Sequence, residues 1–283
     1  MRLALLLAYQ GTRFSGWQIQ EKPRAPLTVQ GVLESAVAHI SGGHVRLHGS
    51  GRTDAGVHAY GQVVHGDVPD RRFPPRGDSV ASDGCDDAGR RWRRALNALL
   101  PPDIRVLAAH AARPDFHART DALHKTYVYD FWQERAFTPP RLVSFVWPCG
   151  PLVVDAMRAA LLPLCGRHSF ATFRNTGTDT ESDVRTVLEA RIDVLPPSPF
   201  LPPHAPALRL TLRADGFLKQ MVRNIAGMLV ACGQGKLSPG DVPSLIAAGA
   251  RHALCAPTAP PQGLALARVA YPSGDGFLNV SPL

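Results

Sequence analysis

The sequence predicts an α+β protein made of two halves, residues 1–112 and 113–283, that share the element order β-α-β-β-α-β. Short apolar runs bounded by Gly and Pro are typical of strands, whereas apolar residues spaced three and four apart indicate amphipathic helices. These two patterns alternate in the same order in both halves, although the residues themselves do not repeat. We therefore expect two ferredoxin-like halves side by side, each a mainly antiparallel sheet with helices on one face.

Local signals predict the elements of the first half. The apolar run from Arg2 to Tyr9 indicates a buried strand, and the helical pattern after Thr28 has an N-cap candidate and ends at Gly42. Residues from about 68 to 90 have no period and are rich in Pro, Gly, Ser and Asp, so we interpret them as an irregular insert. The other elements expected here are strands at about 44–49 and 60–66, a helix at 91–100 and a strand at 104–109.

The second half follows a linker at Arg113-Pro114-Asp115 and has one helix more than the first. Its expected elements are a strand at about 123–132, a helix at about 153–162, strands near 184–194 and 207–214, helices at about 217–232 and 242–248, and a strand at 264–271. The additional helix is the one departure from the element order of the first half.

The charge of the chain favours an acidic partner. The 31 Lys and Arg residues exceed the 23 Asp and Glu residues, which gives a net charge of +8. Nucleic acid is the first candidate, because dispersed basic groups neutralise phosphates, and an RNA would occupy a central cleft over the open faces of the sheets. A basic but otherwise ordinary enzyme is the alternative. The five cysteines form no C-x-x-C pair, and no apolar stretch is long enough for a signal-peptide core or a membrane span. We therefore expect a cytoplasmic location.

One loop, Gly51 to His58, carries the strongest candidate for chemistry. It contains a single acid, Asp54, between glycines, with Arg52 two positions before it, and predicted strands on both sides hold it. The alternative is a plain hairpin turn, because Asp and Gly are common turn residues. We interpret Asp54 as the catalytic acid.

Two other segments carry candidate partners for this loop. Strand alternation places Lys125, Tyr127, Tyr129 and Phe131 on one face, where a ring could stack on a base. An aromatic row of this kind can equally be core. In the segment after Phe217, Lys219 and Arg223 lie four apart, opposite an apolar face. They are either a solvated pair or a source of an arginine that contacts carboxylate or phosphate.

The sequence gives little support to metal or nucleotide chemistry. The spacing of His48, Asp54 and His58 fits no common metal-binding pattern, and no cysteine cluster accompanies them. No P-loop, dinucleotide-binding fingerprint or G-x-S-x-G motif is present. We expect no metal, no nucleotide hydrolysis and no catalytic triad.

Taken together, several stretches resemble the tRNA pseudouridine synthase A family. They occur in order from residue 9 to about 271 and so cover nearly the whole chain, and the run from Arg52 to His58 is highly specific. The matching stretches are Tyr9-Gln10-Gly11-Thr12, Gly16-Trp17-Gln18, Thr28-Val29-Gln30-Gly31, Gly51 to His58, Ala95-Leu96-Asn97, Phe116-His117-Ala118-Arg119, Lys125-Thr126-Tyr127 and Met221-Val222-Arg223-Asn224.

The resemblance implies an enzyme that converts uridine to pseudouridine at positions 38, 39 and 40 in the anticodon stem-loop of tRNA. It implies a homodimer that works without a cofactor or metal, on the two-half fold predicted above. The base must be detached from its sugar, rotated and rejoined through carbon, which requires a carboxylate and a flipped-out nucleotide. Asp54 is then the essential nucleophile or base. The resemblance leaves open whether it attacks C1′, attacks the ring or abstracts the 2′ proton.

The resemblance also implies roles for the other candidates. Arg52 would help to displace the target base, Tyr127 would stack on the uracil and assist proton transfer, and Arg223 would pair with Asp54 and keep it ionised. Leu266 in the last strand would line the pocket. The full set expected to bind substrate is Arg52, Thr53, Lys125, Tyr127, Lys219 and Leu266.

This chain departs from the family pattern at a few positions. The family usually has aspartate where Gln10 stands and arginines near His124 and Val128, so contacts to tRNA are expected to differ there. Two alternative functions remain open at the level of sequence. One is a tRNA-binding protein without catalysis, and the other is a metal-dependent nuclease that uses His48, Asp54 and His58.

Overall fold

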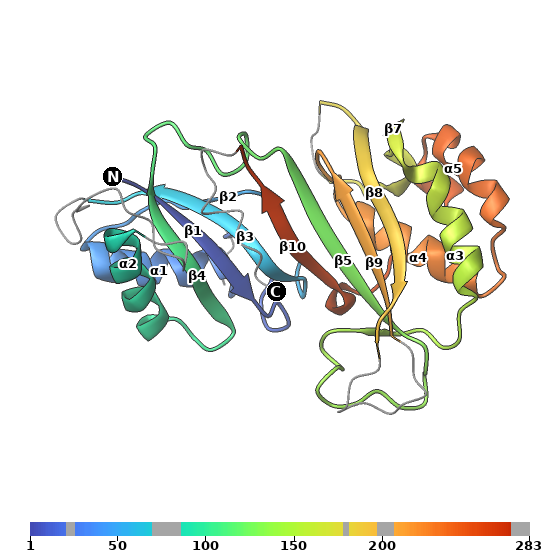
Figure 1. Cartoon of the computed structure of the whole chain (residues 1–283), viewed down its shortest axis with the longest axis horizontal. Helices are drawn as coiled ribbons and strands as arrows, with labels where there is room; N and C mark the ends of the chain where they lie inside the picture. The colour runs from blue at the N-terminus through green and yellow to red at the C-terminus, as the bar shows by residue number, and fades with distance from the viewer. Residues whose placement is uncertain (21–25, 70–85, 178–180, 197–206, 273–283) are drawn as a thin grey trace. The chain divides into compact units, whose positions relative to one another are not determined.

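The computed structural model describes residues 1–20, 26–69, 86–177, 181–196 and 207–272 of the 283-residue chain. It divides into two compact units, Met1–Lys125 together with the chain from Leu266, and Thr126–Ala265. Two strands, β5 (His124–Trp132) and β10 (Leu264–Ala270), have residues in both units. Each unit combines helices with mostly antiparallel strands, so the predicted α+β class is confirmed (Figure 1).

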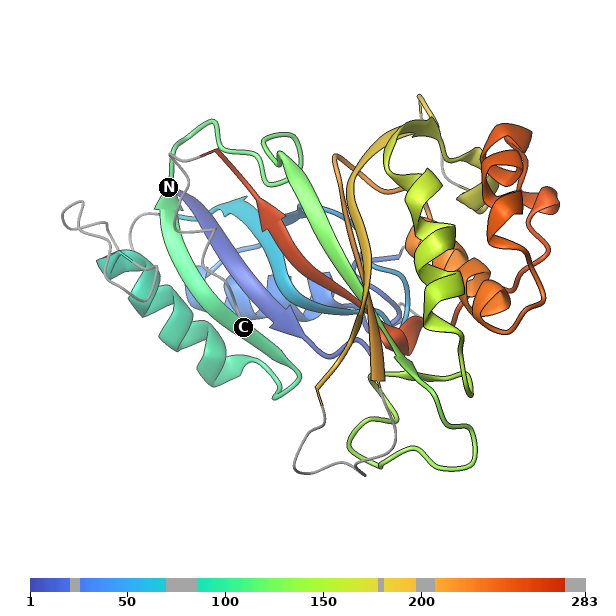
Figure 2. The same cartoon turned by 45° about the vertical axis from the view of Figure 1, so that its right-hand side comes forward.

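The sheet of the first unit is built around β1 (Arg2–Tyr9). This strand is antiparallel to both of its neighbours, β3 (His58–Asp67) and β4 (Ile104–Ala112). Strand β10 follows β3 in the sheet, and the short strand β2 (His48–Gly49) also pairs with β3. The central apolar run of β1 is buried, because neighbouring strands lie on both of its sides and helices lie behind it (Figure 2).

Two helices pack together on one face of this sheet, α1 (Val29–Ser41) and α2 (Asp87–Leu99) (Figures 1 and 2). Thr28 begins α1 by accepting a hydrogen bond from Gly31 N, and Gly42 ends it in the left-handed conformation. Asp86 begins α2, since its carboxylate accepts from Gly89 N. Local caps thus fix where the helices start and stop, and their apolar faces fix how they dock.

The second unit contains strands in the order β5-β9-β8-β7. The strands are β9 (Ala207–Ala214), β8 (Val184–Val194) and β7 (Gly166–Ser169), which pair antiparallel, and β6 (Trp147–Pro148), which pairs parallel with β5. Helices α3 (Val154–Leu161) and α4 (Met221–Gly233) pack against each other, and α5 (Val242–Ala248) lies near β7. Short 3₁₀ turns occupy Leu162–Leu164, Ala171–Phe173, Pro239–Asp241, Arg251–Ala253 and Pro261–Gly263.

Most of the predicted elements are confirmed, and β1, β8, β9 and α5 have the predicted bounds. The predicted irregular insert at about 68–90 is wrong at its end. Helix α2 begins at Asp87, because Asp86 caps it and also accepts a hydrogen bond from Ala111 N. Most of the insert, residues 70–85, lies outside the described residues.

Other bounds also differ from the prediction. The strand expected at 44–49 shrinks to His48–Gly49, and the short strands β6 and β7 were not predicted. Helix α4 begins at Met221 and not at residue 217, because Gln220 has a φ of 59°, which no right-handed helix accommodates. Lys219 therefore precedes the helix that carries Arg223, so the two residues do not share a helix face.

No helix within the described ranges is long and apolar enough to cross a membrane.

Three histidine rings meet beside β3. The His65 ring lies 5.2 Å from that of His48 and 4.6 Å from that of His117, between ring centroids. His65 is buried, and its Nδ1 accepts a hydrogen bond from Ala118 N at 3.1 Å. Burial lowers the pKa of His65 to about 4, helped by the neighbouring histidines and Arg2, while Asp67 acts in the opposite direction. In the folded chain His65 therefore stays neutral until the pH approaches its pKa of about 4.

This burial makes stability depend on pH. The unfolded chain binds a proton at His65 near pH 6.5 and the folded chain only near pH 4, so the free energy of unfolding should fall as the pH drops through this window. The full loss is about 3 kcal/mol. In His65→Asn, whose side-chain oxygen can still accept from Ala118 N, the fall should be smaller. Urea unfolding at a series of pH values measures both proteins, and equal pH slopes would contradict the assignment.

Candidate active site

The loop between β2 and β3 presents Asp54, and its backbone is held from the side of residues 11–17. Thr53 O accepts from Trp17 N at 3.0 Å, and Phe14 O accepts from Gly56 N at 3.2 Å. The approach is so close that a Cβ at Gly11 would lie 2.0 Å from Val57 O. Only glycine fits at that position, so Gly11, two residues after the end of β1, can lie directly against the loop.

Buried polar side chains hold the same loop from the strand side. Gln62 on β3 accepts from the Ser50 hydroxyl at 2.6 Å and donates from Nε2 to Gly51 O at 2.9 Å. The Tyr9 hydroxyl at the end of β1 lies 2.9 Å from Thr53 Oγ1. Burial raises the pKa of Tyr9 to about 12, against the effect of its hydrogen bonds with Thr53 and Gln62. The side chains of Tyr9, Ser50, Thr53 and Gln62 form what we call the loop clamp.

The two charged residues of the loop differ in exposure. Arg52 is exposed, and no hydrogen bond or ion pair holds its side chain among the described residues. Asp54 is half-buried, and its carbonyl oxygen accepts from Val57 N at 3.1 Å, which closes a turn. The hairpin-turn interpretation is therefore correct for the backbone, since β2 and β3 are paired on either side of the loop. The turn leaves the two charged groups at or near the surface.

Two of the three residues considered as metal ligands, His48 and His58, contact other parts of the protein. His58 is 1% exposed, and its Nδ1 accepts from Gly11 N at 3.0 Å, so it serves the backbone. His48 stacks on His65. In the part of the chain that the structure describes, no group of three or more His, Cys, Asp or Glu residues is arranged to hold a metal ion.

Two further expected site residues belong to the first unit. The Lys125 ammonium donates to Ser50 O at 2.6 Å, so it reaches the start of the loop. Leu266 on β10 is fully buried. The structure thus brings Arg52, Thr53, Asp54 and Lys125 into one neighbourhood, and Leu266 is a core residue of the same unit.

Tyr127, in the second unit, is largely buried. Its ring packs edge-on against Phe217, with 5.0 Å between centroids, and is 8% exposed. Tyr129 and Phe131 on the same strand are fully buried, so this part of the aromatic row is core. Burial raises the pKa of Tyr129, and the positive charge of Arg223 opposes that shift. Arg223 therefore lies near the aromatic row of β5.

The two expected cationic residues of this unit, Lys219 and Arg223, lie just before and just after the start of α4. Lys219 Nζ donates to Thr176 O at 2.8 Å, and Arg223 Nε donates to Ala259 O at 2.7 Å. Between them stands Gln220, the one residue other than glycine with positive φ in the described ranges. Such a conformation persists only where the surroundings enforce it, and the side-chain amide of Asn175 bonds to that of Gln220.

A polar network below this helix start was not predicted. Asn224 donates to Phe173 O at 2.7 Å and accepts from the Thr258 hydroxyl at 2.7 Å, and it is fully buried. Arg251 donates to Asn175 Oδ1 at 3.1 Å and to Asn224 Oδ1 at 3.3 Å. The one signal in the sequence was Asn224, an amide in a helix whose other residues, apart from Arg223, are apolar or small. Gln62, a lone amide in the apolar run of β3, gave the same kind of signal.

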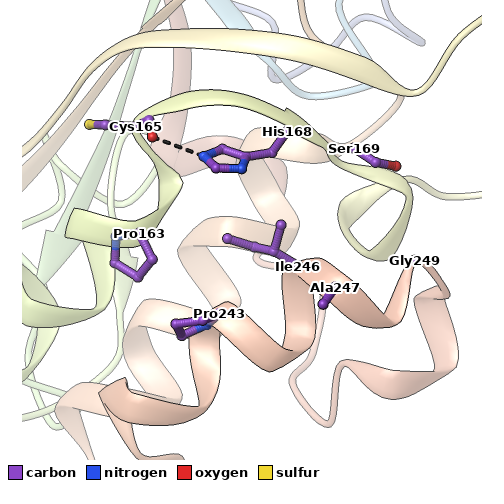
Figure 3. A pocket seen from close by; sticks show the side chains of 8 residues that line it. All are labelled: Pro163, Cys165, His168, Ser169, Pro243, Ile246, Ala247 and Gly249. Carbon is purple, nitrogen blue, oxygen red and sulfur yellow. Dashed lines mark hydrogen bonds between the residues drawn. The ribbon is translucent and has the colours of Figure 1, made fainter.

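A cavity of about 740 Å³ in the second unit contains none of the expected site residues. It lies between α5 and the segment around β7, and His168 Nε2 lies 2.9 Å from Cys165 O at its rim (Figure 3). The other residues that line it are Pro163, Ser169, Pro243, Ile246, Ala247 and Gly249. Because none of the expected site residues lines this cavity, the loop of Asp54 remains the candidate site.

Comparison with known proteins identifies the family. The family model described as tRNA pseudouridine synthase matches residues 6–121 and 160–272. A tRNA pseudouridine synthase A of Nitratidesulfovibrio vulgaris (strain DSM 19637 / Miyazaki F) is 48% identical over 95% of this chain and 99% of its own length. Those of Oleidesulfovibrio alaskensis and Geobacillus kaustophilus are 47% and 41% identical, over 96% and 95% of this chain and 96% and 94% of their own lengths. The chain belongs to the tRNA pseudouridine synthase family.

Proposed function

We propose that this chain isomerises uridine to pseudouridine at positions 38, 39 and 40 in the anticodon stem-loop of tRNA. The observation that carries the proposal is the loop of Asp54, in which a half-buried carboxylate stands beside an exposed arginine on a backbone fixed by buried hydrogen bonds. Membership of the family supports it. So does the net charge of +8, which suits a polyanionic substrate.

The reaction is an isomerisation, so the product contains the same atoms as the substrate. The protein has to supply one carboxylate. The bond from N1 to C1′ breaks, the uracil turns, and a bond from C5 to C1′ forms. The hydrogen on C5 leaves as a proton, and N1 gains one. Asp54 is the proposed nucleophile or base of this exchange. A loop position suits that role, because a rigid scaffold can present a loop residue to a flipped-out nucleotide.

We assign Arg52, Tyr127 and Arg223 to the same reaction. Arg52 displaces the target base, which fits a side chain that is exposed and makes no hydrogen bond or ion pair with the described residues. Tyr127 stacks on the uracil and assists proton transfer, and Arg223 serves as the counter-ion that keeps Asp54 ionised. Arg52 and Asp54 belong to the first unit, and Tyr127 and Arg223 belong to the second. The joint assignment therefore rests on the family resemblance.

The remaining substrate-binding assignments have different support. We assign Lys125, whose ammonium donates to Ser50 O, and Lys219, whose ammonium donates to Thr176 O and Gly177 O, to contacts with phosphate. The Thr53 hydroxyl lies against Tyr9 and shapes the loop next to the nucleotide. Leu266 gives the pocket an apolar wall on the proposed assignment.

The proposed organisation is two ferredoxin-like halves, 1–112 and 113–283. The insert expected at about 68–90 ends before α2. We also propose a cytoplasmic homodimer that works without a cofactor. The pairing of β4 with β1, β1 with β3 and β3 with β2, all antiparallel, supports the ferredoxin-like half at the N-terminus. In the second unit β9 lies between β5 and β8, as β3 lies between β1 and β2. Size-exclusion chromatography with light scattering tests the dimer.

Removal of the acid tests the function itself. With tRNA labelled with tritium at uracil C5, the wild-type chain should release tritium, because C5 loses its hydrogen. Asp54→Asn keeps the side-chain volume and should release it roughly 10²–10⁴-fold more slowly. Asp115→Asn, an exposed carboxylate of the same unit, is the control and should keep normal release. Absence of release by the wild type would show that the chain is not this enzyme and would favour a tRNA-binding protein.

Loss of Arg52 should separate turnover from binding. In Arg52→Ala we expect kcat to fall by about tenfold or more with a smaller change in Kd for tRNA, because the residue acts on the flipped base. Arg94→Ala, which removes an exposed arginine of α2, is the control for loss of charge. If Arg52 were only a phosphate contact, Kd would change as much as kcat, and the salt slope of binding would fall by about one.

A further inference from the structure

We propose that Tyr9 and Gln62 are positioning residues of the isomerisation, which through the loop clamp hold Asp54 in place without contacting the tRNA. The inference rests on the proposed function and names residues that the reaction requires beyond those that face the substrate. It follows from where the clamp attaches, from the direction of its hydrogen bonds and from its burial.

The clamp attaches to the loop immediately before and after Arg52. Gln62 binds the side chain of Ser50 and the carbonyl of Gly51, and Tyr9 binds the side chain of Thr53. Thr53 is also held through its backbone, because its carbonyl oxygen accepts a hydrogen bond from Trp17 N. Three successive anchors therefore end one residue before Asp54. A chain held at that point leaves its carboxylate few positions to adopt.

The direction of the hydrogen bonds explains why an amide is needed. Gln62 accepts through Oε1 and donates through Nε2 at the same time, and a carboxylate in its place could only accept. The carbonyl of Gly51 would then lose its donor. The phenol of Tyr9 is matched in the same way, because Phe would fill its space but leave the Thr53 hydroxyl without that partner.

Burial separates Tyr9 and Gln62 from the substrate. Tyr9 is 4% exposed, and Ser50 and Gln62 are 0% exposed. A macromolecular substrate on the surface cannot reach these side chains. With a pKa of about 12, Tyr9 also stays protonated at neutral pH and is no general base. Any effect of these residues on turnover must therefore act through the loop.

A matched pair of phenol deletions tests the proposal. Tyr9→Phe removes a hydroxyl bonded to the loop. Tyr271→Phe removes a buried hydroxyl of the same unit that donates to Ala118 O at 2.5 Å, away from the loop. We expect Tyr9→Phe to lower kcat by about tenfold to hundredfold with an unchanged Kd for tRNA, since a displacement of about 1 Å can cost about 10²-fold. Tyr271→Phe should lower the melting temperature by a similar amount and keep the wild-type kcat.

Variants of Gln62 supply a second, independent measurement. Gln62→Glu should lower kcat in the same range, and the double variant with Tyr9→Phe should lose less than the product of the two effects, because both act on one loop. Hydrogen exchange at the amides of residues 53–55 should be faster in Tyr9→Phe than in the wild type or Tyr271→Phe. That readout remains available if a Gln62 variant does not fold.

The outcomes separate this proposal from the function on which it rests. An inactive wild-type chain would overturn both. An active wild type with a normal kcat in Tyr9→Phe would overturn only the positioning role. Equal losses of kcat in Tyr9→Phe and Tyr271→Phe would also overturn it, because both would then reflect stability alone.

Discussion

The side-chain amide of Gln62, which is itself fully buried, donates to a loop carbonyl and accepts from a loop hydroxyl. In such surroundings an unmade hydrogen bond costs about 1–3 kcal/mol, so loop conformations that break either contact are strongly disfavoured. The glycine at position 11 closes the other side of the loop through its contact with Val57. These two constraints determine the positions of the exposed Arg52 and the half-buried Asp54.

The second unit uses buried polar groups in a comparable way. Asn224 accepts from Thr258 and donates to Phe173 O, and Arg251 adds donors from the segment that follows α5. Arg223 is one residue away from Asn224 and bonds to Ala259 O. The start of α4 is thus connected to several segments, which supports the unfavourable φ of Gln220. In both units an expected functional residue lies next to a network of buried polar side chains, Asp54 in the first unit and Arg223 in the second.

The sequence is informative wherever a structural signal is local. The apolar run of β1, the Thr28 cap and Gly42 predicted elements that the structure contains, because each depends only on neighbours in the chain. The loop of Asp54 could be singled out because its residues are consecutive. Asp86 shows the limit, since a single cap within a polar stretch extended α2 by a turn.

The polar networks could not be predicted, because their partners are far apart in the chain. Arg251 bonds to Asn175 across 76 positions, and Tyr9 to Thr53 across 44. An isolated Gln62 in an apolar strand indicates that an amide is buried, but not which atoms it reaches. The left-handed conformation of Gln220 is likewise imposed by tertiary contacts, against the preference of the residue.

Strand β10 gives the chain an unusual order of assembly. Its residues from Leu266 onwards belong to the unit that contains Asp54, where Ala270 O accepts from Leu123 N and Tyr271 bonds to Ala118 O. The ribosome makes this strand more than a hundred residues after the rest of that unit, roughly ten seconds later at typical elongation rates. Until then β3 lacks β10, one of the strands that lie next to it. The nascent unit is open to wrong pairing during this interval, because an unpaired strand edge can pair with another chain.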